Sequence, residues 1–429
     1  MAKARECVRL DGGGTTLVFA LAKGGAADLV YLGAALPEGE DLPALDLSAQ
    51  RSVHESQADS PPTPGLLPER KGGWGGTPAV ELAQNGARVE NDFRLLDWER
   101  EGSSLALTYE DERAGFSVTI TWRITQSGIV QSALSLSNAS QATYQLIRLA
   151  SLALPIPARF CEMTSYSGRW AGEMRESRRA IAPEGFARQS AIGKQGFGGG
   201  YWLLLHAAHG TNGAAGDETL AAHLAWSGDY DTRLECDNVG AADGRAMLHM
   251  AARWNAGEVT LAPGATFEAP TAVFARGDNR DALAQRLHRY LREDVLPLDA
   301  ANAPRKVHLN SWEALGSNQS EQGLLALVDS AADLGIERFV LDDGWFAGRR
   351  SDRTSLGDWY VSPHVFPSGL GPLIDRVQSK GMDFGLWVEP EMVSPDSELY
   401  RAHPDWCLAD QGRERGTMRG QLVLDLTRA

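Results

Sequence analysis

Short runs of alternating apolar and polar residues dominate the chain up to about residue 275. The clearest are FSVTITWRI at 116–124, IVQSALSLSN at 129–138 and GEVTLAPGATFEAPTAVFA at 257–275. Gly, Asn, Asp and Pro separate these runs, a pattern typical of a large antiparallel β-sandwich. One stretch at 56–76 is rich in Pro and Gly, contains Trp74 and has no regular pattern. It predicts a long loop.

The pattern changes at Asn279. The following DALAQRLHRYLRE, at 281–293, has leucines at helical spacing above a charged face, which predicts a helix that links two domains. Pro297 and Pro304 then mark a boundary. We therefore predict a β-rich domain over 1–278, a linker helix and boundary over 279–304, and a different architecture over 305–429.

Strands and helices alternate in the last part of the chain. Strands are predicted within 306–312, 337–346 and 382–392, and helices within 321–335 and 369–381. Ser320 is a suitable N-cap for the first of these helices. Gly335 and Gly381 are suitable residues to end the first and the second helix. The βαβαβ order implies parallel strands and is similar to the opening of a (β/α)8 TIM barrel. The predicted fold is thus a β-rich sandwich followed by the first three βα units of an incomplete barrel.

Polar and aromatic residues follow each of the three predicted parallel strands. They are Trp312 and Glu313 after the first, Asp342, Asp343 and Trp345 after the second, and Trp387, Glu389 and Glu391 after the third. A barrel places its active site at these strand ends. Isolated carboxylates there could simply cap helices or turns. The repetition at three strand ends favours a site, and carboxylates beside aromatic rings suit a sugar.

The spacing of these carboxylates limits their roles. Retaining glycoside hydrolysis uses two carboxyl groups about 5 Å apart on opposite sides of the scissile bond. The adjacent Asp342 and Asp343 cannot straddle a bond, so we expect them to grip hydroxyl groups from one side. Glu389 and Glu391 lie on one strand face by spacing. They could be catalytic or could hydrogen-bond loop backbone beneath the sugar.

Composition excludes several classes of function. The formal net charge is −15 with acidic residues spread along the chain, which argues against binding of nucleic acid or an anionic membrane. A neutral or cationic small substrate fits better. The histidines lack metal-ligand spacing, and the glycine clusters do not open a phosphate-binding loop. We predict no metal and no cofactor.

The sequence also carries signals of cellular location. The four cysteines, Cys7, Cys161, Cys236 and Cys407, are far apart and indicate buried thiols in a reducing compartment. The N-terminus lacks the pattern of a signal peptide, and no run of eighteen apolar residues occurs. We therefore expect no membrane span and a cytoplasmic protein.

Four segments carry a resemblance to a known family. VLDDGWF (340–346), SLGDWYVSPHVFPSGL (355–370), GLWVEPEMVSPDSELYRAHPDWCL (385–408) and QLVLDLTR (421–428) resemble the α-galactosidases of glycoside hydrolase family 36. The likeness continues more thinly through SGRWAGE at 167–173 and HLAWSGDYDTRLE at 223–235. These two segments look like the N-terminal supersandwich of that family.

The resemblance implies retaining hydrolysis of terminal α-D-galactosyl residues in oligosaccharides such as raffinose or melibiose. By this likeness Asp342 and Asp343 bind the galactose 4- and 6-hydroxyls, Trp312 and Trp387 wall the sugar pocket, and Arg419 approaches the sugar. The likeness also reduces Glu389 and Glu391 to shaping the pocket.

The family's catalytic residues have no match in this sequence. Its nucleophile is an Asp in a KWD motif on the fourth barrel strand, and its acid/base is an Asp after the sixth. Neither motif occurs here, so we expect a truncated chain with no catalytic residue, inactive as given. The family implies a homo-oligomer for the full-length enzyme, in which some relatives insert an N-terminal loop Asp into a neighbouring subunit. Asp59 lies near that region.

Two other functions stay open at this point. A non-catalytic galactoside-binding protein could use the sandwich and the first barrel units. An α-N-acetylgalactosaminidase or a galactosyl transferase would keep the fold and mechanism and change the substrate.

Overall fold

The computed structural model describes residues 5–50, 65–196, 199, 202–208, 218–236, 246–255, 257–296, 303–409 and 412–428. Two compact units make up the chain, unit 1 (Met1–Ala301) and unit 2 (Asn302–Ala429). Asp59 lies outside the described residues. Of the loop predicted at 56–76, residues 65–76 are described and contain turns with neither helix nor strand.

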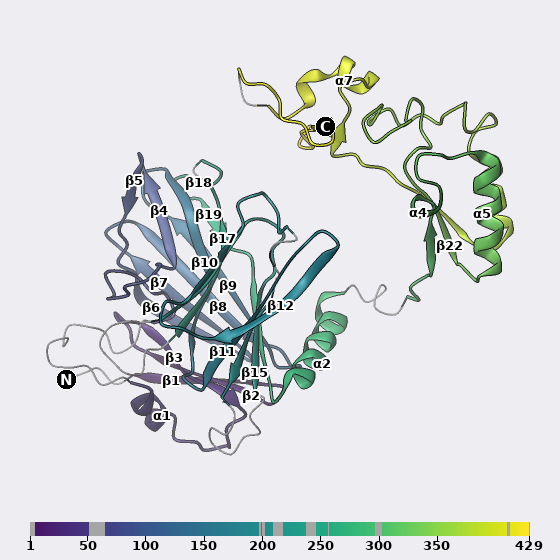
Figure 1. Ribbon diagram of the computed structural model, residues 1–429. Coiled ribbons are helices and arrows are strands. Elements are labelled where there is room, and N and C mark those ends of the chain that lie inside the picture. The colour runs from purple at the N-terminus through teal and green to yellow at the C-terminus, as the bar shows by residue number, and fades with distance from the viewer. Residues whose placement is uncertain are drawn as a thin grey trace. The chain divides into compact units, whose positions relative to one another are not determined.

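Unit 1 is built, in its described part, from three antiparallel sheets (Figure 1). The three-stranded sheet consists of β1 (Glu6–Gly12), β2 (Thr15–Leu21) and β3 (Ala27–Ala34). The seven-stranded sheet consists of β13 (Phe186–Gln189), β16 (Tyr230–Cys236), β17 (Ala246–Arg253), β10 (Tyr144–Ile156), β4 (Val80–Gln84), β5 (Ala87–Val89) and β18 (Thr260–Leu261).

The ten-stranded sheet is the largest. Its strands in order are β12 (Gly172–Ala180), β11 (Phe160–Arg169), β14 (Trp202–Ala207), β15 (Thr219–Leu224), β20 (Ala272–Gly277), β9 (Ile129–Asn138), β8 (Phe116–Ile124), β7 (Ser104–Asp111) and β6 (Arg94–Glu101), with β19 (Thr266–Glu268) beside β9. The prediction of a β-rich, antiparallel first part is confirmed.

One hydrophobic core joins the three sheets of unit 1. In β8 every second residue from Phe116 to Ile124 is buried, as the alternating sequence predicts. Trp122 of this strand is 1% exposed and packs edge-on against Phe19 of β2, with ring centroids 5.4 Å apart. The small sheet is thereby held against the large one.

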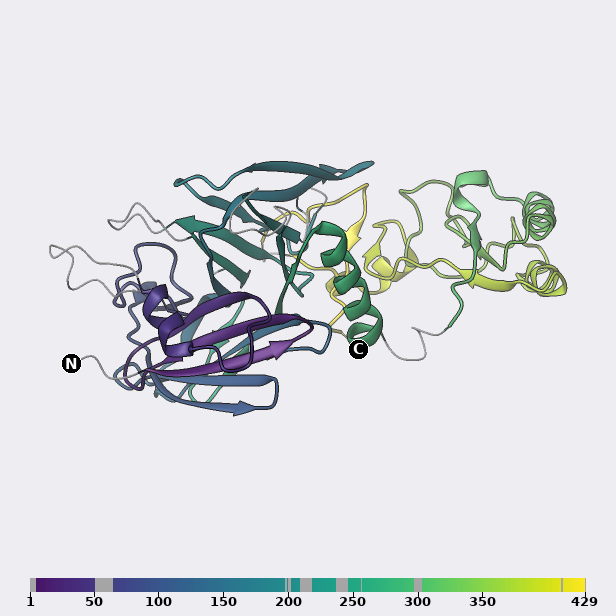
Figure 2. The same ribbon diagram turned by 90° about the horizontal axis from the view of Figure 1, so that it is seen from below.

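Two α-helices accompany the sheets in the described part of unit 1. Helix α1 (Leu42–Ala49) follows the three-stranded sheet and contacts β3 (Figure 2). Helix α2 (Arg280–Tyr290) is the one predicted as a linker, and it continues as a π-helical turn, η2 (Leu291–Val295). Leu283 and Tyr290 are buried in a small core with residues of β15 and β20. The helix is therefore packed on unit 1.

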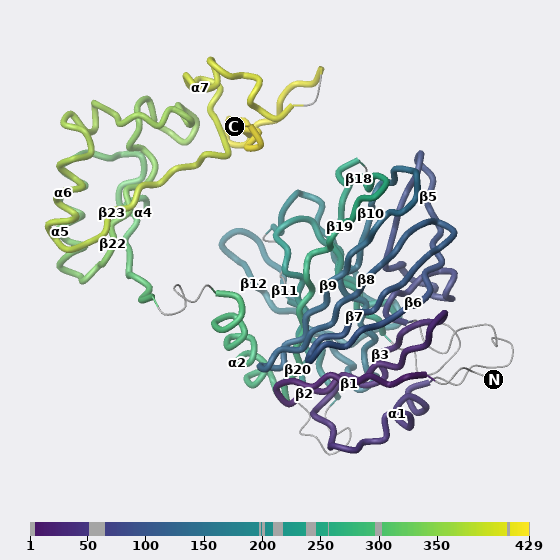
Figure 3. Tube along the Cα trace, turned by 180° about the vertical axis from the view of Figure 1, so that it is seen from behind, coloured from purple at the N-terminus to yellow at the C-terminus, as the bar shows by residue number. Residues whose placement is uncertain are grey.

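Unit 2 begins with the alternation that the sequence predicts. β21 (His308–Asn310), β22 (Arg338–Leu341) and β23 (Asp383–Leu386) form a parallel sheet in chain order. α5 (Glu321–Asp333) and α6 (Gly371–Ser379) connect them and lie side by side on one face of the sheet (Figure 3). Their apolar residues form a core with Phe339 and Leu341 of β22.

The rest of unit 2 consists of short elements. They are α4 (Trp312–Leu315), β24 (Met392–Val393), α7 (Glu398–Ala402), a 3-10 turn, η3 (Pro404–Trp406), and β25 (Leu422–Val423). β24 and β25 pair with each other in an antiparallel ribbon, so β25 is not a fourth strand of the parallel sheet.

The cysteines correct one expectation. All four are free thiols, but only Cys407 is buried, whereas Cys7 and Cys236 are half-buried and Cys161 is exposed. Cys161 lies in β11 at a position that alternates away from the core, a face that residue type alone does not reveal. Within the described part of the chain, every helix is too short or too polar to span a bilayer.

Candidate functional site

The ends of the three parallel strands bring the predicted site residues of unit 2 to one edge of the sheet. Asn310 is in register with Val340, and Leu341 with Leu386, so the carboxyl ends of β21, β22 and β23 are level. Asp342 and Asp343 directly follow β22, and Trp387 directly follows β23. Parallel pairing alone produces this convergence.

Asp342 is buried, and each of its carboxylate oxygens accepts one hydrogen bond. Its Oδ1 accepts the backbone N–H of Asp343 at 2.6 Å, and its Oδ2 accepts from the side-chain amide of Asn310. Its own N–H donates to Oγ of the buried Ser311 at 3.0 Å. The carboxylate is therefore held in one orientation.

Asp343 forms a buried bidentate ion pair with Arg349. Nε and Nη2 of Arg349 donate to the two carboxylate oxygens at 2.8 and 2.7 Å, and the arginine is 1% exposed. Nη1 of the arginine donates to the carbonyl of Thr354 at 2.9 Å. Gln319 donates to the backbone carbonyls of Asp342 and Asp343 at 3.1 and 2.6 Å. Side chain and backbone of the Asp pair are thus both fixed.

Tryptophans at and near the same strand ends contact one another. The indole N–H of the buried Trp345 donates to the carbonyl of Trp387 at 2.9 Å. Trp359 lies between them, with ring centroids 6.2 Å from Trp345 and 6.1 Å from Trp387. Trp312 is 38% exposed, and its backbone N–H donates to Oδ1 of Asn310 at 2.8 Å. Trp312, Trp359 and Trp387 are partly exposed and offer apolar surface, whereas Trp345 belongs to the core of unit 2.

Arg419 joins the site through Glu389. Its Nη2 lies 3.0 Å from the Glu389 carboxylate, and its backbone has a φ of 54°, in the left-handed region. Burial raises the pKa of Glu389, and nearby Glu391 and Asp343 add to this, whereas Arg419 and Arg349 oppose it. The Arg419–Glu389 ion pair adds charged groups to the segment that follows β23.

The two glutamates that the sequence places on one strand face lie beyond β23, which ends at Leu386, and they differ in environment. Glu389 is mostly buried and bonded to Arg419, whereas Glu391 is exposed. In the described residues, no hydrogen bond joins Glu313 to the aspartates, and none joins Arg419 to Trp312. The assigned binding roles of all these residues stay predictions.

The sequence patterns did not predict several residues that the structure brings into the cluster. Asn310 ends the first strand and could have been found by the same rule that found Asp342. Arg349 lies in a loop, and no sequence pattern distinguishes it from its exposed neighbour Arg350. Trp359 lies in the 355–370 segment that resembles the family, where the sequence predicts no role for it.

The cluster suits polyhydroxylated ligands better than metal ions. Among the described residues, no group of three or more His, Cys, Asp or Glu side chains is arranged to hold a metal. Carboxylate oxygens that accept one hydrogen bond keep lone pairs for hydroxyl donors, and the tryptophans provide faces for the C–H groups of a sugar.

Comparison with family models agrees with this chemistry. The model of the glycosyl hydrolase family 36 N-terminal domain matches residues 25–253, and the model of melibiase matches residues 266–429. These matches put the chain in the class of glycoside hydrolases. Within that class, it belongs to glycosyl hydrolase family 36.

Individual relatives are α-galactosidases. The chain is 34% identical to an α-galactosidase of Escherichia coli over 401 residues, which is 93% of this chain and 55% of that protein. A variant of α-galactosidase AgaA from Geobacillus stearothermophilus, solved in complex with stachyose, is similar with a TM-score of 0.86 and 27% identity. The α-galactosidase from Lactobacillus brevis gives 0.84 and 27%.

The matches cover nearly all of this chain but only part of each relative. The matches to these two solved structures cover 99% of this chain, but only 62% of the Geobacillus chain and 60% of the Lactobacillus chain. The chain thus spans 55–62% of the length of these three relatives.

Proposed function

We propose that the whole protein is a retaining α-galactosidase, and that this chain supplies its N-terminal supersandwich and the first three βα units of its (β/α)8 barrel. The observation that carries the proposal is the Asp342–Asp343 pair, fixed at the end of β22 in a chain of family 36. Oligosaccharides such as stachyose and raffinose occupy related solved structures. Terminal α-galactosyl groups of such sugars are the expected substrate.

The incomplete barrel is supported by the parallel sheet of unit 2. In the described residues no strand pairs with the outer edge of β23. Leu386, the last residue of β23, and Val388, two residues beyond it, are 39% and 51% exposed, unusual for a barrel, where side chains at these positions are normally covered. A fourth strand would pair with this edge. The boundaries at 278 and 305 stay predictions.

Within this proposal each site residue has a role. Asp342 and Asp343 accept hydrogen bonds from the galactose 4- and 6-hydroxyls, Trp312 and Trp387 wall the pocket, and Arg419 approaches the sugar. The nucleophile and the acid/base come from a part of the protein that corresponds to the remaining length of its relatives. No cofactor is required, and we propose a cytoplasmic homo-oligomer.

Other substrates and functions receive less support. The named relatives are α-galactosidases, which favours galactoside hydrolysis over a non-catalytic galactoside-binding protein, an α-N-acetylgalactosaminidase or a galactosyl transferase.

A chimera tests the proposal. The chain is joined to the part of the Escherichia coli α-galactosidase that lies beyond its match, and turnover of an aryl α-galactoside is measured. We expect the chimera to hydrolyse it and the 429-residue chain to show no turnover above background, because binding groups alone supply no nucleophile.

Variants of the chimera test the site. Asp342→Asn should lower kcat/KM by about tenfold or more, since a charge-assisted hydrogen bond to a hydroxyl is worth about 1.5–3 kcal/mol. Asp375→Asn, an exposed carboxylate on α6, is the matched control and should leave kcat/KM unchanged. Equal kcat/KM for both variants would remove Asp342 from the site. Turnover by the 429-residue chain itself would contradict the proposal that the nucleophile and the acid/base come from another part of the protein.

A further inference from the structure

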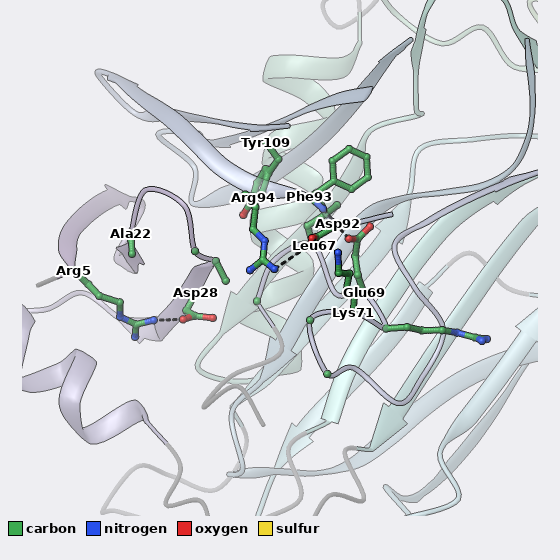
Figure 4. Close-up of a pocket in the computed structure, with 16 residues that line it drawn as sticks. Arg5, Ala22, Asp28, Leu67, Glu69, Lys71, Asp92, Phe93, Arg94 and Tyr109 are labelled. Carbon is green, nitrogen blue, oxygen red and sulfur yellow. Dashed lines mark hydrogen bonds and ion pairs between the residues drawn. The ribbon is translucent and has the colours of Figure 1, made fainter. Parts of the chain in front are cut away.

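Glu69 in unit 1 and Gln319 in unit 2 are buried side chains that bind backbone groups, and each has one oxygen without a partner among the described residues. Glu69 lies in the wall of a polar cavity, where its Oε2 accepts the backbone N–H of Phe93 at 3.1 Å (Figure 4). Protein covers its other oxygen, Oε1, so a molecule in the cavity could not reach that atom. Gln319 instead binds the backbone of the aspartate site.

Gln319 binds the backbone where the parallel sheet ends. The pairing of β21 with β22 stops at Asn310, and the chain then turns into α4. The N–H of Ser311 still donates to the carbonyl of Val340 at 3.0 Å, but the N–H of Asp342 donates to Oγ of Ser311, also at 3.0 Å. Side chains therefore take over the hydrogen bonds that a longer first strand would supply.

Both carbonyls of the aspartate pair depend on Gln319. Its Nε2 donates to the carbonyl of Asp342 at 3.1 Å and to that of Asp343 at 2.6 Å. Neither carbonyl accepts another hydrogen bond from the described residues. A primary amide has two N–H donors, one for each carbonyl. Because both aspartates are buried, loss of this amide would leave two buried carbonyls unpaired.

The surroundings of Gln319 restrict where its amide can lie. The residue directly precedes Ser320, the N-cap of α5, whose Oγ accepts the N–H of Gly323 at 3.2 Å. Gly344, directly after the aspartate pair, packs against the amide, since a Cβ added there would lie 3.4 Å from Cδ and Nε2 of Gln319. The start of a helix and the turn after β22 therefore both hold the amide against the two carbonyls.

We propose that Gln319 is a positioning residue for the galactoside site, an inference that rests on the proposed function. By binding both carbonyls, Gln319 sets the direction in which the carboxylates of Asp342 and Asp343 project toward the sugar hydroxyls. It acts through the two aspartates and does not touch the sugar. Without the amide, the two peptide groups can rotate toward other partners and move both carboxylates. A displacement of about 1 Å in a site can cost about 100-fold in rate.

Three variants of the chimera with the Escherichia coli α-galactosidase test this role. Gln319→Met keeps the length of the side chain without a donor, so kcat/KM for an aryl α-galactoside should fall about tenfold or more at both pH 5 and pH 8. Gln319→Glu has no donor as a carboxylate and one donor as a carboxylic acid. Gln322→Glu, the same change at an exposed position in the first turn of α5, is the matched control and should equal the unmodified chimera.

The pH dependence of Gln319→Glu distinguishes positioning from packing. The introduced carboxyl group would be buried and would face two carbonyl oxygens beside the carboxylates of Asp342 and Asp343, which raises its pKa, whereas Arg349 would lower it. The carboxylic acid should therefore be populated at pH 5 and the carboxylate at pH 8.

We expect the loss of kcat/KM in Gln319→Glu, relative to the unmodified chimera at the same pH, to be large at pH 8 and to shrink at pH 5. The loss in Gln319→Met should be the same at both pH values. Because Gln319→Glu is compared with itself at two pH values, the result does not depend on how well Gln319→Met folds. An equal loss in Gln319→Glu at both pH values, or no loss in Gln319→Met, would overturn the inference.

Amide hydrogen exchange on the 429-residue chain gives a measurement that needs no galactosidase activity. In Gln319→Met, peptides covering 341–345 should exchange faster than in wild type, while peptides from α6 stay unchanged. Equal acceleration throughout unit 2 would show that Gln319 only stabilises the fold and would overturn the inference. If the unmodified chimera shows no turnover, the proposed function fails, and exchange of the 341–345 peptides still decides whether Gln319 holds the aspartate pair.

Discussion

The buried Asp343–Arg349 ion pair makes the stability of the aspartate site depend on keeping both charges. Both partners are removed from water, and each meets the other through two hydrogen bonds. Removing one charge of such a pair leaves the other buried and uncompensated, at a cost of about 3–5 kcal/mol. Asp342 instead has neutral partners, Asn310 and a backbone amide. Two adjacent aspartates thus differ in what they contribute to stability.

We therefore expect Asp343→Asn to destabilise unit 2 by about 3 kcal/mol and Asp342→Asn by about 1 kcal/mol. Hydrogen exchange of peptides from β22 and α5 at increasing denaturant measures both. The double variant Asp343→Leu, Arg349→Met should recover most of the loss, because it leaves no unpaired charge. Equal effects of the two Asn variants would contradict the importance of the ion pair.

Glu69 makes unit 1 sensitive to pH. Its folded pKa of about 7 exceeds the ordinary value of 4.5, so between these values the folded state binds more protons than the unfolded state. The stabilisation is complete below about pH 4.5 and is lost as pH rises through about 7. Its size is at most about 3 kcal/mol.

Comparing wild type with Glu69→Gln isolates this effect, since other carboxyl groups titrate equally in both. The unfolding free energy of unit 1, measured by denaturant titration at pH 5 and pH 8, should fall more with pH in wild type than in the variant. Parallel behaviour of the two proteins would show that the pKa of Glu69 is not raised.

At the scale of elements, the turn after β22 depends on a glycine. Gly344 follows the Asp pair with a φ of 110°, a conformation that L side chains rarely adopt. Gly371 begins α6, and a Cβ added there would have no other atom within 4 Å. The same substitution at these two sites should therefore have opposite consequences.

Gly344→Ala should destabilise unit 2 by more than about 1 kcal/mol, whereas Gly371→Ala should be neutral or stabilise by up to about 1 kcal/mol. Thermal unfolding monitored by calorimetry measures both changes. In the chimera, Gly344→Ala should also lower galactosidase activity by moving Asp343. A neutral Gly344→Ala would mean that the turn relaxes without cost.

The elements of unit 2 also show why helix ends were predictable. Ser320 Oγ accepts the N–H of Gly323 at 3.2 Å, and Gly335 has a φ of 78° after α5, as the capping pattern predicts. The end of α2 was predicted less accurately, because the helix predicted at 281–293 changes to a π-helical turn after Tyr290. Leu296 is extended before Pro297, a position where proline disfavours helix.

At the scale of the whole molecule, the two units have separate hydrophobic cores. The core of unit 1 draws on three sheets, and that of unit 2 on one three-stranded sheet with two helices. A larger core buries more apolar surface and gives more stability. The 292–306 region carries exposed tryptic sites at Arg292, Arg305 and Lys306.

We expect two unfolding transitions, with unit 2 unfolding first, and trypsin cleavage in the 292–306 region that leaves unit 1 resistant. Calorimetry and mass spectrometry of the digest measure these outcomes. A single cooperative transition with equal resistance of both units would contradict the division and the incomplete barrel.

The sequence by itself determined the elements and their order, because hydrophobic periodicity and capping are local properties. The strands at 116–124 and 129–138 and the parallel order of β21, β22 and β23 followed from it, as did the placement of Asp342, Asp343 and Trp387 at strand ends. Only the tertiary structure decided which side chains meet. The pairing of Asp343 with Arg349, the different environments of Glu389 and Glu391, and the Glu69 oxygen that has no partner among the described residues all depend on loop paths and burial. No local sequence pattern encodes these contacts.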